Sequence, residues 1–256
     1  MSMVGPRKRL AILAYHKIGE PTPGGWDTWY FIPQPTFVEQ INVIRNSGWS
    51  VIDLPAFLRG LDDPRTVSDR SLLLTFDDGH KSFHLNAFPI LRSFGLPAVC
   101  FIPTDHVGGS SIFDRGIEPE EFLCDWDDLR EMSRHGIAIQ SHGASHEWAS
   151  LMEAPQLREE IARSKRTLEL ELREKVETLA FPFSDPGRDA KAVDEGLREA
   201  GYRAAFLCGG GPDIVELPVP DRFRIDRLAV YRDTDLKSLL SGEATTLGSE
   251  TKSRGK

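Results

Sequence analysis

The chain has 256 residues, of which 40% are hydrophobic, and this is sufficient for one large domain with an ordinary core. Its formal net charge of −8 and the lack of a basic stripe argue against nucleic acid or an anionic membrane as the main partner. No run of about 18 apolar residues occurs, so we expect no membrane span.

The cysteines and the N-terminus bear on the cellular location. Cys100, Cys124 and Cys208 lack paired spacing, and two of them lie inside apolar runs, which is typical of buried thiols in a reducing compartment. The first nine residues carry positive charges without the apolar stretch and cleavage site of a signal peptide. We therefore expect a cytoplasmic protein, whereas its oligomeric state is not indicated.

Apolar runs of strand type alternate with segments of helical periodicity. The expected strands cover residues 10–15, 49–54, 71–76, 98–103, 137–140, 178–183, 204–208 and 224–230. The expected helices cover residues 36–46, 82–94, 126–134, 155–172 and 189–200. Four of them are followed by glycines of the C-cap type, namely Gly48, Gly95, Gly136 and Gly201.

This alternation predicts a single α/β domain over residues 10–241, and seven or eight such units favour a barrel. Residues 26–35 read as an aromatic loop without a clear element. Residues 1–9 are expected to form a flexible N-terminus. Residues 242–256, rich in Ser, Thr, Gly and Lys, are expected to form a disordered tail.

Two adjacent carboxylates follow the expected strand 71–76. Asp77, Asp78 and Gly79 stand at a strand end, where the active sites of parallel α/β folds gather. The same three residues are also common in a simple strand-to-loop turn, because aspartate accepts local backbone hydrogen bonds and glycine tolerates positive φ. Both interpretations are open at this point.

Two histidines follow the expected strand 137–140. If the backbone turns helically after that strand, His142 and His146 face one point, and with a carboxylate from elsewhere they form a facial metal site. Asp78 is the proposed third ligand. Surface histidines are the alternative, but the position of both groups at strand ends favours the metal site.

Three short motifs carry a family resemblance. Residues 75–79 read Thr-Phe-Asp-Asp-Gly, residues 142–146 begin and end with histidine, and Pro182 and Phe183 end a strand-like segment. In these motifs, their order and their spacing the chain resembles the polysaccharide deacetylase family, metal-dependent carbohydrate esterases that remove N-acetyl groups from amino sugars. The resemblance covers nearly the whole chain. Gly143 stands where the family carries Ser or Thr.

The resemblance implies a distorted, incomplete (β/α) barrel of about seven strands, with a metal at the carboxyl ends of the strands. It assigns Asp78, His142 and His146 to the metal and Asp77 to the catalytic base. Two imidazoles and a carboxylate suit zinc best, and cobalt, nickel or manganese are further possibilities. Such an ion leaves coordination positions for water and the substrate carbonyl, and it lowers the pKa of the water towards about 7.

Aromatic residues near the third motif are candidates for sugar binding. The resemblance implies that Pro182 and Phe183 wall the sugar groove, where an apolar face stacks on a pyranose ring; a simple strand end is the alternative. Trp148 follows the second histidine by two residues and has the same expected role, with a buried core tryptophan as the alternative. The oxyanion is expected near the backbone N–H of Phe183.

The chain departs from the family in two places. Ala180 stands where many members carry an arginine that orients the catalytic aspartate. Arg227 is our candidate replacement, and a surface charge on an outer strand is the alternative.

No histidine follows His146, so the usual general acid is missing. His16, after strand 10–15, is the candidate donor; a core or bulk-facing histidine, or Asp77 in both roles, is the alternative. The remaining histidines are expected to be solvent-exposed: His80, His84, His106 and His135.

These observations favour a metal-dependent hydrolase that removes an acetyl group from an N-acetylated amino sugar in a glycan, an oligosaccharide or a sugar precursor. The cytoplasmic expectation points towards precursors or short oligosaccharides. A carbohydrate-binding module with a degenerate site, or a hydrolase of another small amide, remains open.

Overall fold

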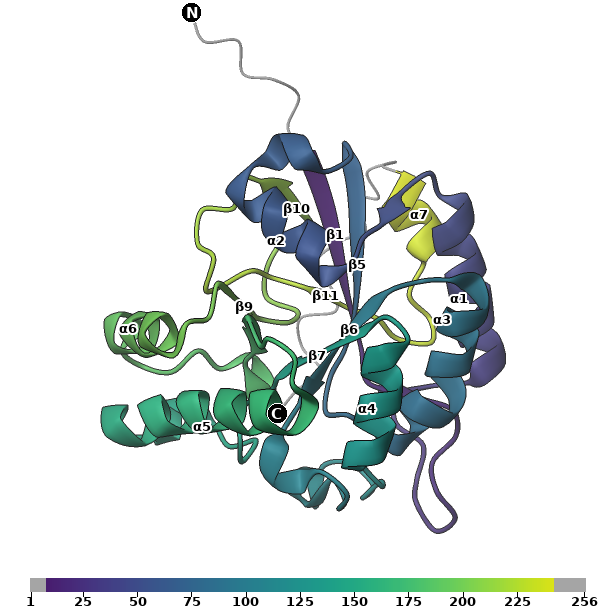
Figure 1. Ribbon diagram of the computed structural model, residues 1–256. Coiled ribbons are helices and arrows are strands. Elements are labelled where there is room, and N and C mark those ends of the chain that lie inside the picture. The colour runs from purple at the N-terminus through teal and green to yellow at the C-terminus, as the bar shows by residue number, and fades with distance from the viewer. Residues whose placement is uncertain (1–7, 242–256) are drawn as a thin grey trace, which may run out of the picture.

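A curled mixed sheet runs through residues 8–241, the part of the chain that the computed structural model describes (Figure 1). β10 is antiparallel to β1, while the neighbouring pairs from β1 to β9 are parallel. Two short strands, β11 (Leu228–Ala229) and β4 (Ser50–Val51), pair with β1 and β5. The main strands follow the order β10 (Ile214–Leu217), β1 (Lys8–Tyr15), β5 (Arg70–Phe76), β6 (Ala98–Ile102), β7 (Ile137–Ser141), β8 (Thr178–Ala180) and β9 (Ala204–Phe206).

The segment 222–230 links the two edges of this sheet. The N–H of Leu207 donates to the carbonyl of Ile225 at 2.9 Å, which places the segment beside β9. The N–H of Val230 donates to the carbonyl of Ala14 at 2.9 Å, which places its other end beside β1. The predicted fold, a distorted, incomplete barrel of about seven strands in one domain, is confirmed.

Helices surround the sheet (Figure 1). They are α1 (Gln34–Asn46), α2 (Leu54–Asp62), α3 (Phe88–Phe94), α4 (Trp126–Arg134), α5 (Ala154–Leu172), α6 (Ala190–Ala200) and α7 (Leu236–Ser241). The five predicted helices are present, although the second begins with a π-helical turn, Phe83–Ala87. As predicted, Gly95 and Gly201 end α3 and α6 with left-handed φ angles of 64° and 84°.

Three predicted strands are shorter by three or more residues in the structure. The strand at 49–54 shrinks to β4, because Asp53 caps α2 by accepting the N–H of Ala56 at 2.7 Å. The strand at 224–230 is reduced to β11, and the strand at 178–183 ends at Ala180. Helix α2 was missed: its first residue, Leu54, was interpreted as the end of a strand, and residues 55–62 were assigned to no element.

The ends of the domain and the aromatic loop also differ in detail from the expectation. Lys8 and Arg9 pair with β10 and therefore belong to the sheet rather than to a flexible N-terminus. The rest of that segment, and the tail expected at 242–256, lie outside the described residues. The aromatic loop is mostly irregular, but its short strand β3 (Phe31–Ile32) pairs with β2 (Lys17–Ile18).

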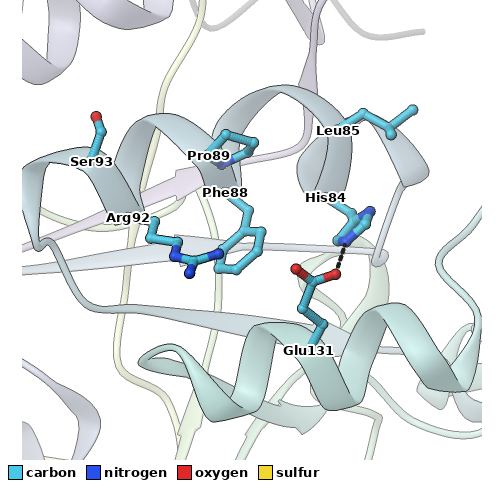
Figure 2. A pocket seen from close by; sticks show the side chains of 7 residues that line it. All are labelled: His84, Leu85, Phe88, Pro89, Arg92, Ser93 and Glu131. Atoms are coloured by element: carbon cyan, nitrogen blue, oxygen red, sulfur yellow. Dashed lines mark hydrogen bonds and ion pairs between the residues drawn. The ribbon is translucent and has the colours of Figure 1, made fainter.

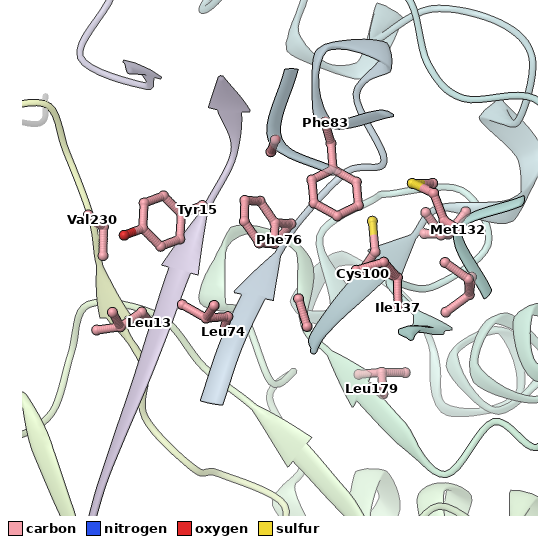
Figure 3. Packing of buried hydrophobic residues seen from close by; sticks show 14 of the residues in the cluster. Leu13, Tyr15, Leu74, Phe76, Phe83, Cys100, Met132, Ile137, Leu179 and Val230 are labelled. Carbon is pink, nitrogen blue, oxygen red and sulfur yellow. The ribbon is translucent and has the colours of Figure 1, made fainter. Parts of the chain in front are cut away.

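Buried side chains form two clusters on opposite faces of the sheet. Leu13, Tyr15 and Phe76 belong to the larger cluster, which packs against α1, α3, α4 and α5 (Figure 3). Alternate residues of the same strands, such as Ile12 and Phe101, pack in the second cluster with α2. Because both faces are covered, the polar groups of the sheet are restricted to the strand ends.

Cys100 and Cys124 are buried as predicted, Cys208 is half-buried, and all three thiols are free. Among residues 8–241, none of the helices has both the length and the apolar character needed to cross a bilayer.

Candidate metal centre

The carboxyl ends of β5 and β7 bring together the three predicted metal ligands. One potential ligand atom each from Asp78, His142 and His146 lies within 4.8 Å of the others, and all three residues are buried. The Oδ1 atom of Asp78 is 3.2 Å from Nε2 of His142 and 3.1 Å from Nε2 of His146. These atoms therefore converge on one point from two strands that are not neighbours in sequence.

Left-handed backbone turns aim these side chains inward. Asp78 has a φ angle of 68°, so two consecutive carboxylates both enter the site after β5. Gly79 follows with the same φ angle, and a Cβ there would lie 2.6 Å from Cδ1 of Ile102. His146 also has a positive φ angle, of 59°. The sparsely populated conformation is typical of functional sites.

The backbone does not turn helically after β7, the condition under which the two histidines were expected to face one point; residues 142–146 form an irregular loop instead. The carboxylate of Glu160 on α5 holds this loop by accepting three hydrogen bonds. Its Oε1 atom accepts the N–H groups of Ala144 and Ser145 at 2.7 and 2.6 Å, and the hydroxyl of Ser145 at 2.9 Å. A half-buried carboxylate on a helix thus replaces local helical bonds as the support of the histidine pair.

The donor set fits a divalent ion. The Nδ1 atom of His142 is 2.7 Å from the carbonyl of Ala180 and donates its proton there, which leaves the Nε2 lone pair facing Asp78. Burial raises the pKa of Asp78, but the close contacts of its carboxylate with His142, His146 and His80 hold it well below its ordinary value. Two imidazole nitrogens and an ionised carboxylate are suitable ligands for zinc and its neighbours in the first transition series.

The predicted base, Asp77, forms a buried ion pair with Arg227. Both residues are almost fully buried, and the guanidinium lies over the rings of Phe101 and Phe206 at 5.3 and 5.8 Å. Burial raises the pKa of Asp77, but the charge and hydrogen bonds of Arg227, together with His142 and His16, outweigh it and lower the pKa below its ordinary value. The surface alternative for Arg227 is wrong, because segment 222–230 carries it between β9 and β1.

His16 lies beside this ion pair. Its Nε2 atom is 3.9 Å from Oδ2 of Asp77, and its ring packs on Tyr30 with a centroid distance of 4.7 Å. The side chain is 18% exposed, so it is neither a core nor a bulk-facing histidine. Burial lowers the pKa of His16 more than the carboxylates of Asp78 and Asp77 raise it.

The third motif places aromatic rings against the metal ligands. Phe183, with a φ angle of 56°, stacks on Trp148 at a centroid distance of 4.3 Å and meets the ring of His146 at 4.8 Å. Trp148 is 45% exposed, which excludes the core alternative for this residue. Pro182 is buried within the 3₁₀ turn Pro182–Ser184 rather than facing solvent.

Two residues near the ligands were missed as site residues. His80, expected at the surface, is fully buried, and its Nε2 atom is 3.2 Å from Oδ2 of Asp78. At this point the chain lies against residue Leu123, with which His80 forms an isolated antiparallel β-bridge. Phe113 stacks on His146 at 4.0 Å from a loop that carries no motif. The only local signal for His80 was its position two residues after a ligand.

The other histidines lie apart from the ligand cluster. His135 is exposed as predicted, whereas His84 and His106 are half-buried. His84 forms an ion pair with Glu131 beside a groove between α3 and α4 (Figure 2). His106 is 3.0 Å from the carbonyl of Ser145. Hydrogen-bond partners across the fold explain why these two are not solvent-exposed.

Sequence comparisons identify relatives of the chain. The family model described as polysaccharide deacetylase matches residues 65–205, more than half of the chain. YxkH of Bacillus subtilis (strain 168) is 24% identical over 195 residues, which are 76% of this chain and 63% of that protein. The poly-beta-1,6-N-acetyl-D-glucosamine N-deacetylase of Staphylococcus aureus (strain N315) is 24% identical over 186 residues, 69% of this chain and 61% of that protein. The chain thus spans less than two thirds of the length of either relative.

Solved structures share the fold. IcaB from Ammonifex degensii has a TM-score of 0.76 at 22% identity, with 93% of this chain and 98% of that chain covered. The Streptococcus pyogenes deacetylase PplD in complex with acetate has a TM-score of 0.75 at 18% identity, with 91% and 97% covered. At these identities the likeness establishes the incomplete barrel alone.

Proposed function

Because this chain belongs to the polysaccharide deacetylase family, we propose that it hydrolyses the N-acetyl group of an amino sugar with the help of a divalent metal. The observation that carries this proposal is the Asp77–Arg227 ion pair directly beside the cluster of Asp78, His142 and His146. A site that had lost turnover would have no reason to retain a buried, paired carboxylate next to the metal ligands.

The metal is proposed to be zinc, with cobalt, nickel or manganese as ions that the same donors accept. When bound, a divalent ion lowers the pKa of a water molecule towards about 7 and polarises the acetyl carbonyl. The ligand geometry favours binding because Ala180 fixes the tautomer of His142 and His80 holds one oxygen of Asp78.

Asp77 is proposed as the base. Its lowered pKa keeps it ionised at neutral pH, so that it accepts the proton of the attacking water. Arg227 fixes the carboxylate through two hydrogen bonds and thereby performs the role that the family assigns to the arginine replaced here by Ala180. His16, 3.9 Å from Asp77, is proposed to protonate the departing amine.

The substrate is proposed to be a glycan of N-acetylated amino sugars. The name of the Staphylococcus aureus relative specifies a polymer of N-acetylglucosamine, which supports this substrate class for the present chain. Phe183 and Trp148 form an exposed aromatic platform beside His146, and such a platform stacks on the apolar face of a pyranose ring. The oxyanion donor near Phe183 and the cytoplasmic location remain predictions.

Acetate release from N-acetylated oligosaccharides, measured before and after chelation and after zinc is restored, tests this function. We expect activity to disappear with the chelator and to return with zinc. Asp77→Asn should keep its metal and lose roughly 10² to 10⁴ in rate, because it removes the proton acceptor while the three candidate metal ligands stay in place. Asp105→Asn is the control, since Asp105 pairs with Arg163 at the surface. No acetate release by the metal-loaded wild type would favour the non-catalytic binding module.

A further inference from the structure

A second group of aromatic rings adjoins His16 and has no part in the chemistry described above. Tyr30 packs on His16, Trp29 packs on Tyr30 with a centroid distance of 4.3 Å, and Tyr231 packs on Trp29 at 4.9 Å. Trp29 is 51% exposed, so this row of rings leads from His16, the proposed proton donor, to the surface. We call Trp29, Tyr30 and Tyr231 the second aromatic platform.

Ion pairs and hydrogen bonds hold the loop that carries this platform. Arg232, next to Tyr231, contacts both carboxylate oxygens of Asp27 at 2.8 and 2.5 Å and donates to the carbonyl of Thr28 at 2.5 Å. The hydroxyl of Thr28 donates to the buried carboxylate of Glu118 at 2.5 Å. The exposed ring of Trp29 is therefore pre-organised, which reduces the entropy that a ligand would lose when the ring is immobilised.

The position of the leaving amine places the sugar on the side of the site where His16 lies. In N-deacetylation the oxygen of water forms a bond to the acetyl carbon and the C–N bond breaks; acetate leaves, while the amine nitrogen stays on the sugar ring and takes up a proton. The group that protonates the amine, His16, therefore faces the sugar. The rings that continue outward from His16 lie where the glycan extends, while the platform of Trp148 and Phe183 adjoins His146 instead.

We propose that the second aromatic platform is a sugar subsite that stacks on a pyranose ring adjacent to the one deacetylated. The enzyme then binds an oligosaccharide more tightly than a monosaccharide, because only the longer ligand reaches both the metal centre and Trp29. This inference rests on the proposed function for the position of the reacting sugar. It defines the substrate class further, as an oligomer or polymer rather than a free sugar or a small amide.

Calorimetric titration of the zinc-loaded Asp77→Asn protein with N-acetylglucosamine and with its β-1,6-linked pentasaccharide tests the subsite. We expect the pentasaccharide to bind more tightly, and the additional change Trp29→Ala to reduce this advantage about ten-fold. Trp29→Tyr, which keeps an aromatic face, should restore most of it. Trp26→Ala is the matched control, because Trp26 lies in the same loop, is 52% exposed and has no ring contact within residues 8–241.

Three outcomes would overturn the subsite: equal affinity for both sugars, no binding of either, or the same loss with Trp26→Ala as with Trp29→Ala. Circular dichroism of each variant excludes misfolding as the cause. Acetate release by the wild type is measured separately. Trp29-dependent binding without acetate release leaves the subsite standing and removes the proposed catalysis, whereas acetate release without a length preference removes the subsite alone.

Discussion

Arg227 and Asp77, 150 residues apart in sequence, form two nearly parallel hydrogen bonds of 2.7 Å between guanidinium and carboxylate. Arg227 also donates to the hydroxyl of Thr75 and to the carbonyl of Leu207, both at 3.0 Å. The arginine thus fixes the orientation of the proposed base, which follows β5, and links it to the backbone next to β9 at the far edge of the sheet. Planar, two-point pairing of this kind fixes orientation as well as charge.

Replacing Arg227 should destabilise the protein strongly. Arg227→Gln leaves Asp77 as a buried carboxylate without its counter-ion, and breaking such a pair costs about 3–5 kcal/mol. Arg222→Gln is the control, because Arg222 pairs with Asp62 at the surface, where ion pairs contribute at most about 1 kcal/mol. Urea unfolding at pH 7 measures both. Equal losses in the two variants would contradict a special role for the buried pair.

The same pair predicts a pH dependence of stability. The pKa of Asp77 is lower in the folded protein than in the unfolded chain, where it is about 3.9. The ionised carboxylate therefore stabilises the fold fully above that unfolded pKa, and this stabilisation is lost as the pH falls through the pKa of the folded state. In Arg227→Gln the carboxylate loses the charge that lowers its pKa, so this contribution should vanish. Unfolding free energies measured from pH 7 down to pH 3 should therefore converge for wild type and variant.

His80 should control metal affinity without being a ligand. It occupies Oδ2 of Asp78 and leaves Oδ1 facing the two histidines, so His80→Ala should weaken zinc binding about 10- to 100-fold. Competition with a chromogenic chelator measures this directly. His84→Ala serves as the control, since His84 also pairs with a carboxylate but lies at the groove of Figure 2. Unchanged affinity in His80→Ala would show that Asp78 needs no such support.

His16 should set the alkaline limb of the pH–rate profile. Only its protonated form donates to the amine, and its pKa is lowered, so the limb should have its midpoint below about 6.5, the ordinary histidine value. His16→Ala should lower the rate and flatten that limb while the acidic limb survives. A profile with both limbs and the full rate intact would instead favour Asp77 as both base and acid.

Gly143 should be intolerant of the side chain that the family carries at this position. Its φ angle is 74°, and a Cβ would lie 3.0 Å from the Glu160 oxygen that supports the histidine loop. Gly143→Ala should therefore cost more than the roughly 1–2 kcal/mol of left-handed strain alone. Gly48→Ala isolates that strain, because Gly48 has a φ angle of 75° and open space around it. Equal destabilisation would mean that Glu160 moves aside freely.

The convergence of Asp78 and His142, two of the candidate metal ligands, was predictable from the sequence because it depends on a local rule. Asp78 and His142 directly follow apolar strands, and parallel strands of one sheet end at the same edge. The periodic helices were predictable for the same reason, since an apolar stripe and its caps lie within a few residues. Helix α2 shows the limit of such rules, because Asp53 and Pro55 mark its start but its first residue, Leu54, continues the strand-like run 49–54.

The partners of these residues were decided only by the tertiary structure. Closure of the barrel by segment 222–230 brings Arg227 to Asp77, and the fold-back after β5 buries His80 beneath Asp78. The row from His16 to Tyr231 likewise joins the two ends of the described chain. Backbone preferences reach only a few residues along the chain, whereas these contacts depend on how the strands curl and which edges meet, and no local pattern records that choice.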